Sequence, residues 1–349
     1  MGRTLAIAGA TGAVGAELRR LVEARGLPVD EVRFLASSRS AGKALAYAGG
    51  EVTVGDLAEP DAFDGVDLAL FSAGGGRSLE HAPRAVEAGA IVVDNSSAWR
   101  MDPEVPLVVT EVNAAALDAR PPKGIVANPN CTTMIAMLPL KALHDAFGLT
   151  SVVATSYQAA SGAGQKGSDE LLEQARTLLE EPDLLQRDGL AAADRAAHDV
   201  HAATLAFNCV PQIGTLGDGG YTDEELKLQN ESRKILGLPE LAVSPTCVRV
   251  PVVVGHAIAV RATFTEPVGA AAAAEVMDGF PGLVLDDLPT PLEYAFRDET
   301  AVGRVRQDLG DPRALNFWVV GDNLLKGAAL NTVQIAEELI ARGHVERRP

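Results

Sequence analysis

The sequence predicts an α/β protein whose N-terminal part is a doubly wound parallel sheet, and three observations lead to this prediction. Thr4–Ala8 is a short, continuous apolar run, as expected of a strand buried on both faces. A glycine-rich turn follows it and opens a helical pattern over residues 13–25. Strand-like apolar runs recur at residues 31–36, 67–71 and 90–94, with a helix expected over residues 78–88.

Length and composition set the outer bounds. The 349 residues are enough for two domains, and 47% hydrophobic with 22% charged residues is typical of a globular chain. A formal net charge of −17 without a basic stripe argues against nucleic acid as a partner. The sequence shows neither a membrane span nor a signal-peptide pattern. Three widely spaced cysteines form no disulfide framework and no CxxC motif, so we expect a cytoplasmic protein.

The turn after the first strand, Gly9-Ala-Thr-Gly-Ala-Val-Gly15, is a G-x-x-G-x-x-G variant of the dinucleotide-binding fingerprint. Glycines in such a turn let the backbone approach a pyrophosphate at the N-terminus of the following helix. The order of strand, turn and helix at the beginning of the chain favours this interpretation. The alternative is an ordinary βα turn.

The second strand ends in Ser37-Ser-Arg-Ser40, where an NAD-binding domain usually carries an acidic residue for the ribose 2′-hydroxyl. Arg39 among three serines suits a 2′-phosphate instead, so the sequence favours NADP. The alternative is a solvated surface arginine. Arg100, which follows the polar turn after residues 90–94, also has two interpretations: it pairs with a phosphate or it lies on the surface.

Cys131 stands at the centre of Ala127-Asn-Pro-Asn-Cys-Thr-Thr133. Asn130 is a good N-cap and an apolar run at helical spacing follows, so we expect the thiol on the first turn of a helix. The unpaired N–H groups and the macrodipole at that position favour an anion, and the thiolate is the nucleophilic form of cysteine. The alternative is a buried cysteine that follows a turn.

Further along the chain, residues 150–158 are strand-like and lead into a glycine turn over residues 159–164. An amphipathic helical stretch is expected over residues 168–200. His198 lies in that stretch and His201 directly after it; nothing supplies metal partners there, and we interpret both as surface or core residues.

Two more strands are expected at residues 246–254 and 257–264, joined by Gly255-His256. Arg249 lies among β-branched and apolar residues, where burial is costly without an anionic partner, so it is a stronger functional candidate than an exposed arginine. His256 follows a glycine at a strand junction, which is a good place to aim an imidazole. A hydrogen-bonded core histidine is the alternative.

A capped helix begins at Thr222, because Glu225 stands three residues later as in a capping box. Glu224 and Lys227 are spaced i,i+3 on one face of that helix, where the alternative to ligand binding is a solvated ion pair. A last apolar helix is expected over residues 323–341, packing back on the first domain.

Six motifs, in order along essentially the whole chain, together resemble aspartate-semialdehyde dehydrogenase. They are Gly9-Ala-Thr-Gly-Ala-Val-Gly15, Asn128-Pro-Asn-Cys-Thr132, Tyr157-Gln-Ala-Ala-Ser-Gly-Ala163, Glu224-Glu-Leu-Lys227, Arg249-Val-Pro251 and Gly255-His256. The glycine loop alone is shared with many folds, whereas the cysteine, glutamine and arginine–histidine motifs together are far more specific. No catalytic position departs from the family pattern.

The resemblance implies a Rossmann NADP-binding domain made of residues 1–130 and 321–349. Residues 131–320 would form a glyceraldehyde-3-phosphate-dehydrogenase-like α/β domain that is catalytic and carries the contact of a homodimer. The implied reaction is the NADPH-dependent reductive dephosphorylation of L-aspartyl-4-phosphate to L-aspartate 4-semialdehyde, in lysine, threonine and methionine biosynthesis. No metal is required.

The resemblance also implies a role for each site residue. Cys131 would form a thioester, with His256 as its acid/base partner and Gln158 orienting the substrate carbonyl. The substrate ligands would be Asn130 and Gln158 near the cysteine, Arg249 for the α-carboxylate, Glu224 for the α-amino group, and Arg100 with Lys227 for the phosphate. The cofactor contacts would be Gly9, Thr11, Gly12, Ala13, Val14, Arg39, Ser40, Ser161, Gly162 and Asn323.

Two rival functions stay open. N-acetyl-γ-glutamyl-phosphate reductase also uses a cysteine, a histidine and NADPH, but its substrate amine is acylated and uncharged, so Glu224 would have no ammonium group to bind. An inactive paralogue that acts as a binding or scaffold protein would have no reason to keep the cysteine, glutamine, arginine and histidine motifs together.

Overall fold

The structure is a computed structural model that describes residues 2–346, and it divides the chain into two compact units. The first unit runs to Asn130 and also contains Lys234–Gly237 and the chain from Leu324 onward. The second consists of Cys131–Arg233 and Leu238–Asn323. The C-terminal return therefore begins at Leu324 rather than at residue 321, and the short segment 234–237 was not expected in the first unit.

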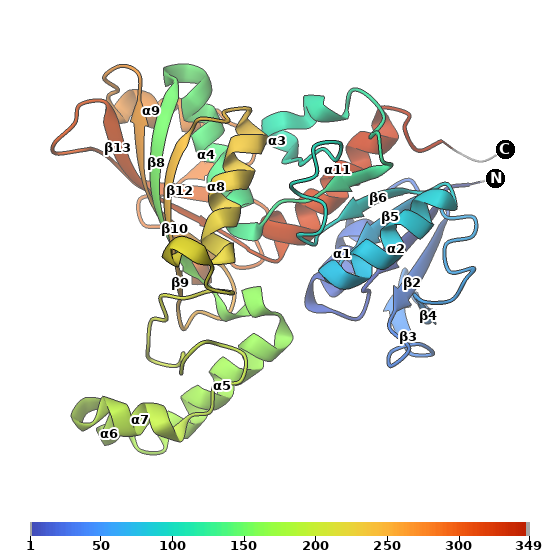
Figure 1. Ribbon diagram of the computed structural model, residues 1–349, viewed down its shortest axis with the longest axis horizontal. Helices are drawn as coiled ribbons and strands as arrows, with labels where there is room; N and C mark the ends of the chain where they lie inside the picture. The colour runs from blue at the N-terminus through green and yellow to red at the C-terminus, as the bar shows by residue number, and fades with distance from the viewer. Residues whose placement is uncertain (1, 347–349) are drawn as a thin grey trace. The chain divides into compact units, whose positions relative to one another are not determined.

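A seven-stranded sheet forms the centre of the first unit, in the order β3-β4-β2-β1-β5-β6-β7 (Figure 1). Its strands are β1 (Thr4–Ala8), β2 (Glu31–Ala36), β3 (Ala44–Tyr47), β4 (Gly50–Asp56), β5 (Leu68–Phe71), β6 (Ile91–Asp94) and β7 (Ile125–Ala127). The central strands pair in parallel, and the predicted doubly wound sheet is confirmed. The antiparallel β3–β4 pair was missed because its residues are half exposed and lack a continuous apolar run.

Helices cover both faces of this sheet. They are α1 (Ala13–Ala24), α2 (Gly75–Glu87), α3 (Thr110–Asn113), the π-helical turn η4 (Leu325–Ala329) and α11 (Leu330–Ala341), with a short 3₁₀ turn η1 (Ala114–Leu117). α1 packs with α11, whereas α2 follows a crossover in the opposite direction and lies on the other face. The expected single helix over residues 323–341 is instead a π-helical turn followed by α11.

The second unit is built on a mixed six-stranded sheet in the order β11-β12-β13-β10-β8-β9 (Figure 1). The strands are β8 (Leu149–Gln158), β9 (Ala242–Arg249), β10 (His256–Phe264), β11 (Leu283–Leu285), β12 (Thr300–Gln307) and β13 (Ala314–Gly321). α4 (Cys131–Phe147) and α9 (Ala270–Asp278) pack against each other and against the strands. The short helix α10 (Pro291–Tyr294) packs against β13.

Two expectations for this unit were wrong in their bounds. The strand expected over residues 246–254 is β9, which begins earlier and ends at Arg249, because Pro251 lacks an N–H and restricts the residue before it. β9 is not the sheet neighbour of β10, since β8 lies between them. The stretch over residues 168–200 contains three helices, which are α5 (Gln165–Leu179), α6 (Pro182–Arg187) and α7 (Gly189–Arg195).

Candidate active site

Cys131 is the first residue of α4, as the sequence predicts. The helix continues through a run of buried side chains, from Thr132 to Leu140, that anchors it in the second unit. The Sγ atom of Cys131 lies 3.3 Å from Nε2 of His256, the first residue of β10. Two residues that are 125 positions apart in the chain thus form a pair with the geometry of a nucleophile and its acid/base partner.

The orientation of the His256 ring fixes its proton. The backbone N–H of Ala159 donates to Nδ1 at 3.0 Å, so the proton of a neutral imidazole lies on Nε2, the atom that faces the sulfur. Burial and the nearby Arg249 charge lower the pKa of His256 to about 3. His256 is therefore neutral at physiological pH and donates toward Cys131, which favours the thiolate.

The turn after β8 closes around this pair. Gln158 ends the strand, is buried, and donates from Nε2 to Ser156 Oγ at 3.1 Å. A Cβ atom at Gly162 would come within 2.7 Å of Nη1 of Arg249 and 3.5 Å of Cε1 of His256. Glycine at this position therefore lets the turn approach both side chains closely.

Ser161 and Asn323 hydrogen-bond each other through their side chains, with Asn323 Nδ2 donating to Ser161 Oγ at 3.0 Å. The Asn323 Oδ1 atom accepts from the backbone N–H of Gly255 at 2.9 Å, which fixes the orientation of the amide. Ser161 and Asn323, both predicted as cofactor contacts, thus lie together beside Gly255, the residue that precedes His256.

Arg249 is buried at 6% exposure. Its Nη1 donates to the Ala159 carbonyl at 2.7 Å, and within residues 2–346 no carboxylate lies at salt-bridge distance from it. Burial lowers the pKa of Arg249, which reflects the cost of holding its charge away from water. A buried guanidinium with open donors is a fitting receptor for a carboxylate.

Glu224 and Lys227 lie on the first turns of α8 (Asp223–Leu236), and the predicted capping box is confirmed by bonds between Thr222 and Glu225. Lys227 Nζ lies 3.2 Å from Glu224 and 2.6 Å from Asp223. The Glu224 carboxylate is largely buried, with its side chain 10% exposed. The pair is therefore neither solvated nor separated: each side chain holds the other in place.

Cys247 offers a contrast to Cys131. Burial raises the pKa of the Cys247 thiol to about 12, so it stays protonated. Cys209 is exposed and Cys131 is intermediate in exposure. Of the three thiols, Cys131 is the one that lies at a helix start beside an imidazole.

In the first unit, the glycine turn lies at the point where the strand order reverses between β1 and β5. Gly9 has a φ angle of +89°, and a Cβ there would lie 2.2 Å from the Ser72 carbonyl oxygen. Gly12 precedes α1 and has no side chain to cap the helix, so the first N–H groups of α1 face the turn. This is the switch-point crevice in which doubly wound sheets bind dinucleotides, and the turn fits a pyrophosphate.

Arg39 and Ser40 lie in the turn after β2, at the same edge of the sheet. Arg39 is exposed, and no other described residue forms a hydrogen bond or an ion pair with it. The Arg39 guanidinium is therefore exposed and available to a 2′-phosphate.

Arg100 is not a surface residue. It is 8% exposed, and its Nε and Nη2 donate to the carbonyl oxygens of Asn128 and Asn95 at 3.0 and 2.8 Å. The Asn128 side chain donates to Asn95 Oδ1 at 2.8 Å. Asn130, also buried, ends this unit directly before Cys131 in the chain.

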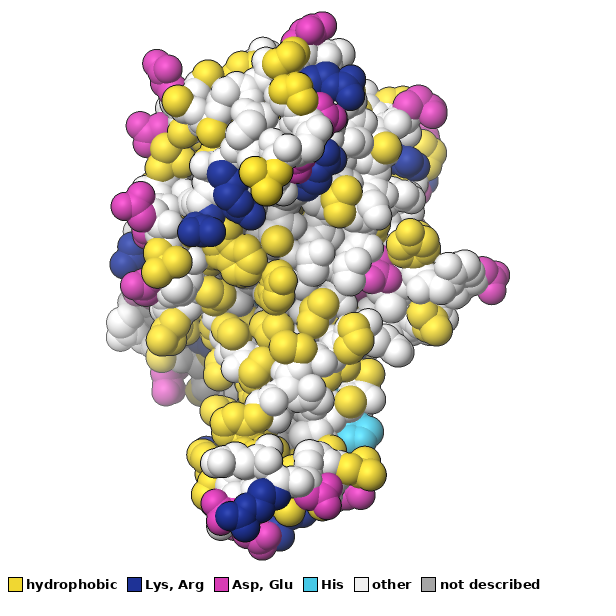
Figure 2. All heavy atoms as spheres, turned by 90° about the vertical axis from the view of Figure 1, so that its left-hand side faces the viewer, with side chains coloured by type: hydrophobic (Ala, Val, Ile, Leu, Met, Phe, Trp, Pro, Cys, Tyr) yellow, Lys and Arg dark blue, Asp and Glu magenta, His cyan; other side chains and the backbone are white. Residues whose placement is uncertain are grey.

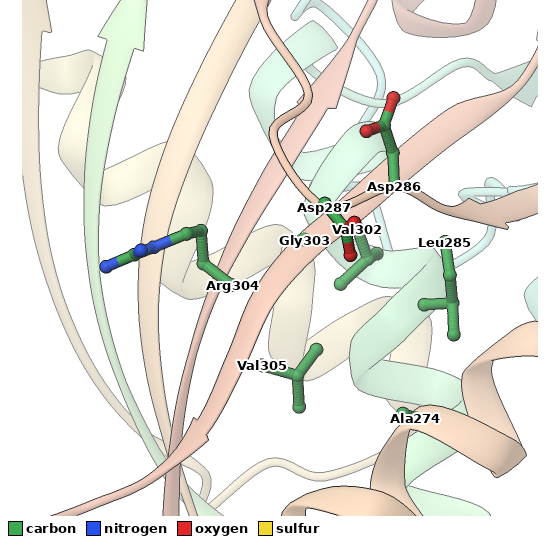
Figure 3. Close-up of a pocket in the computed structure, with 8 residues that line it drawn as sticks. All are labelled: Ala274, Leu285, Asp286, Asp287, Val302, Gly303, Arg304 and Val305. Atoms are coloured by element: carbon green, nitrogen blue, oxygen red, sulfur yellow. The ribbon is translucent and has the colours of Figure 1, made fainter.

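A separate pocket of about 470 Å³ lies between α9, β11 and β12 (Figure 3). Its cation, Arg304, points away from the other labelled side chains. Its acid Asp286 already accepts from Leu288 N and Tyr294 Oη. The predicted site residues do not line this pocket, so it is distinct from the Cys131 site.

Among residues 2–346, no three His, Cys, Asp or Glu side chains are grouped closely enough to hold a metal ion. His201 is buried with Nε2 3.2 Å from the Gly167 carbonyl oxygen, and His198 is exposed. No helix in the described part of the chain is both long and apolar enough to cross a membrane.

The fold and the Cys131–His256 pair define a dehydrogenase of the semialdehyde type. Residues 4–120 match the family model for the semialdehyde dehydrogenase NAD-binding domain, and residues 140–326 match that for the semialdehyde dehydrogenase dimerisation domain. Aspartate-semialdehyde dehydrogenases of Corynebacterium melassecola and Mycolicibacterium smegmatis are each 50% identical to the chain, over 97% of it and 99% of their own length. The chain belongs to the aspartate-semialdehyde dehydrogenase family.

Solved structures agree. Aspartate semialdehyde dehydrogenase II from Vibrio cholerae, complexed with ASA, superposes with a TM-score of 0.91. It is 42% identical, and the match covers 98% of this chain and 99% of that one. A probable aspartate-semialdehyde dehydrogenase from Pseudomonas aeruginosa matches with a TM-score of 0.88 at 32% identity, over 97% and 99% of the two chains.

Two contributors to the site were not found from the sequence. The Ala159 N–H that fixes the His256 ring is a backbone group, and a backbone group leaves no signal in residue type. Glu225 was found as a helix cap, but its second bond, to the Cys247 N–H, joins two elements that only the fold brings together.

Proposed function

We propose that this protein catalyses the NADPH-dependent reductive dephosphorylation of L-aspartyl-4-phosphate to L-aspartate 4-semialdehyde through a thioester on Cys131. The observation that carries the proposal is the 3.3 Å approach of Cys131 Sγ to a neutral His256 whose proton lies on Nε2. Family membership at 50% identity supports the choice of substrate.

In this reaction the Cys131 thiolate attacks the acyl-phosphate carbon, a C–S bond forms, and inorganic phosphate leaves with the electron pair of the C–O bond. The reduced dinucleotide, when bound, supplies the hydride that converts the thioester carbon to a thiohemiacetal. The Nε2–H of His256 donates a hydrogen bond to the oxygen that becomes negative in that adduct, and the C–S bond then breaks as the carbonyl re-forms. The products are the aldehyde and a regenerated thiolate.

Three side chains of the second unit then recognise the amino acid. Arg249, buried and without a carboxylate partner among the described residues, binds the α-carboxylate. Glu224 accepts from the α-ammonium group, and Gln158, at the end of β8, orients the reacting carbonyl. Because Lys227 Nζ lies 3.2 Å from the Glu224 carboxylate, substrate ammonium has to share or replace that contact.

Phosphate recognition is assigned to Lys227 and Arg100. Lys227 carries a positive charge beside two carboxylates, which raise its pKa against the opposing effect of burial. Arg100 donates two of its nitrogens to backbone carbonyls, which holds the guanidinium in a defined orientation. Asn130 lies between the Arg100 partner Asn128 and Cys131 in the chain, and is proposed as a substrate ligand on that ground.

NADP is the proposed cofactor. Gly9, Thr11, Gly12, Ala13 and Val14 form the open turn at the start of α1, and Arg39 with Ser40 follows the neighbouring strand β2. Ser161, Gly162 and Asn323 form the corresponding set in the second unit, close to His256. The NAD-binding family match supports a nicotinamide dinucleotide, and Arg39 supports the 2′-phosphate.

A homodimer formed through the second unit is proposed as the working assembly, in the cytoplasm. Figure 2 shows hydrophobic side chains gathered on one side of the molecule. In the second unit, Val153 on β8 is 45% exposed and Phe296 is 65% exposed. Exposed apolar surface of this kind is typical of association sites, and the matched family model is a dimerisation domain.

The central test is the phosphate-dependent reduction of NADP by L-aspartate semialdehyde. Cys131→Ser should fold and bind NADP but lose nearly all turnover, because a serine hydroxyl is largely protonated at neutral pH. Cys209→Ser, at an exposed thiol, is the matched control and should keep full activity. Substantial activity in Cys131→Ser, or trapping of the acyl group on Cys209 or Cys247, would remove Cys131 from the mechanism.

Cofactor choice has its own test. Arg39→Ala should weaken NADP binding by about 1.5–3 kcal/mol, roughly 10- to 150-fold, with a smaller effect on NAD. Michaelis constants for both dinucleotides measure this. An equal effect on both would show that Arg39 acts away from the 2′-phosphate.

A substitution of Glu224 distinguishes the proposed reaction from the rival reduction of N-acetyl-γ-glutamyl phosphate. With a free amine, Glu224→Gln should lower catalytic efficiency for aspartate semialdehyde by about 1.5–3 kcal/mol. With an acylated amine the same change would be harmless or helpful. Lys227→Met should instead raise the Michaelis constant for phosphate.

A further inference from the structure

Helix α8 lies along the free edge of strand β9. Three of its side chains, spaced one helical turn apart, hydrogen-bond to the backbone of β9 or of the residue before it. Glu225 Oε1 accepts from Cys247 N at 3.1 Å. Gln229 Nε2 donates to Val243 O at 3.2 Å, and Arg233 Nε donates to Leu241 O at 2.9 Å. Residues at i, i+4 and i+8 share one face of a helix, so α8 is docked on the strand by a single polar stripe.

The edge of β9 needs such a partner. β9 is the last strand of the sheet, and its far side would otherwise leave backbone groups unpaired. Pro245 has no N–H to satisfy, and the N–H of Arg249 donates to Val210 O at 2.8 Å. The N–H of Cys247, between them, is the one that Glu225 satisfies.

Glu225 has a second task at the same time. Its Oε2 accepts from the N–H of Thr222 at 2.8 Å, and Glu225 N donates back to Thr222 Oγ1 at 3.3 Å. One buried carboxylate therefore both caps the helix and ties its first turn to the strand, at 8% residue exposure.

The two elements joined by Glu225 are the ones that carry the proposed amino-acid ligands. Glu224 precedes it on α8, and Arg249 lies two residues beyond its bonding partner Cys247 on β9. Burial lowers the pKa of Arg249 and the Glu224 charge opposes that effect, so the two side chains lie within electrostatic reach of each other. Their separation depends on how the first turn of α8 is held against β9.

We propose that Glu225 is a positioning residue that sets the spacing between the Glu224 carboxylate and the Arg249 guanidinium, and thereby selects substrates that carry an ammonium and a carboxylate group on the same carbon. This inference rests on the proposed function, because it takes Glu224 and Arg249 as the two ligands of the amino acid. Glu225 itself does not touch the substrate.

The experiment compares two aldehydes that differ in one group: L-aspartate semialdehyde, and succinate semialdehyde, which lacks the amine. In Glu225→Ala, the Michaelis constant for L-aspartate semialdehyde should rise about tenfold, with kcat and the Michaelis constant for phosphate within about twofold of the parent. The preference for the aminated substrate over succinate semialdehyde should fall by a similar factor.

Three further variants separate positioning from general stability. Gln229→Ala removes a bond from the same helix face to the same strand, one turn farther from Glu224, and should leave the substrate preference unchanged. Thr222→Ala removes the hydroxyl of the cap but leaves the bond to Cys247, and should lower the melting temperature without changing the preference. Glu225→Gln keeps an acceptor for Cys247 N and should restore most of the preference.

The outcomes are distinct. The proposal is overturned when Glu225→Ala and Gln229→Ala change the preference equally, or when Glu225→Ala lowers kcat alone. If Glu225→Ala does not fold, Glu225→Asp replaces it: the shorter side chain keeps the charge but reaches less far toward Cys247 N, so it should lower the preference more than Thr222→Ala does. If Glu224→Gln and Arg249→Met leave the preference intact, the proposed function fails, and this is seen independently of Glu225.

Discussion

Lys326 and Arg249 are both buried cations, one in each unit, and their surroundings differ. Lys326 is 1% exposed, and its Nζ donates to Glu111, to Asn331 at 3.0 Å and to Gln334 at 2.8 Å. Arg249 is 6% exposed, donates to one backbone carbonyl, and has no carboxylate at salt-bridge distance within residues 2–346. Both cations lose their contact with water on folding, but of the two only Lys326 has a carboxylate beside it that offsets the cost of burying the charge.

The difference indicates what each cation does. Although burial alone would raise it, the Lys326 charge and hydrogen bond hold the pKa of Glu111 below its ordinary value, so the pair is ionised inside the first unit. Such a pair fixes the π-helical turn η4 to α3 and leaves nothing free for a ligand. Arg249 keeps donors available, and a buried charge without an anion is costly unless a ligand supplies one.

Breaking the compensated pair should give the largest effect. Lys326→Met leaves Glu111 buried beside a methyl group, and we expect the free energy of unfolding to fall by about 3–5 kcal/mol. Michaelis constants should stay within about twofold of the parent, since the residues that Lys326 bonds, Glu111, Asn331 and Gln334, are not among the proposed ligands. Urea unfolding and steady-state kinetics measure the two effects.

The double variant Glu111→Leu/Lys326→Met is the control for that experiment. Replacing both members of a buried pair by apolar groups should recover most of the lost stability, because no unpaired charge remains. A single variant as stable as the parent, or a double variant worse than the single one, would contradict the assignment of Lys326 as a compensated structural cation.

Removing the uncompensated cation should act in the opposite way. Arg249→Met should lower kcat/KM for L-aspartate semialdehyde by about 2–4 kcal/mol, roughly 30- to 1000-fold, because the α-carboxylate loses a desolvated partner. The free energy of unfolding should stay the same or rise, since the parent bears the cost of burying that charge.

Arg249→Lys sharpens this result. It keeps the charge but loses the planar fork, so it should recover only part of the activity. If Arg249→Met were instead strongly destabilised with little loss of catalytic efficiency, Arg249 would belong with Lys326 as a structural cation and the carboxylate assignment would be wrong.

A third buried base, His256, gives the smallest effect at neutral pH, because its contribution to stability changes only in acid. Its pKa is lowered to about 3 by burial and by Arg249, against an ordinary value of 6.5 in the unfolded chain. The unfolded state therefore binds the extra proton first, so this contribution to stability is complete above pH 6.5 and is lost as the pH falls toward 3. In His256→Asn, the pH dependence of the unfolding free energy in that window should be shallower by at most about 1.4 kcal/mol per pH unit.

The same shift predicts that His256 contributes no acid limb near pH 6.5 to the pH profile of kcat/KM. An acid limb with an apparent pKa near 6.5 that vanishes in His256→Asn would contradict this prediction, because the imidazole would then titrate as it does in water. The variant retains a polar side chain of similar reach, so residual turnover with an unchanged profile would assign the limb to another group.

Local features of this protein were predictable from the sequence. The turn from β1 into α1 was recognised because glycine positions and an apolar run are read within a few residues. The start of α4 at Cys131 and the capping box at Thr222 are likewise short-range signals, and both are confirmed. The family resemblance then predicted the chemical roles of the site residues, although the sequence does not show which residues contact them.

The tertiary structure decided everything that depends on distant partners. The proton on His256 Nε2 is set by a backbone group 97 residues away, and the docking of α8 on the edge of β9 joins two elements through one carboxylate. The sequence marked Arg249 as costly to bury and left Lys326 unmentioned. Only the fold shows that the first lacks a carboxylate and that the second has one, because the free energy of a buried charge depends on which groups long-range packing brings beside it.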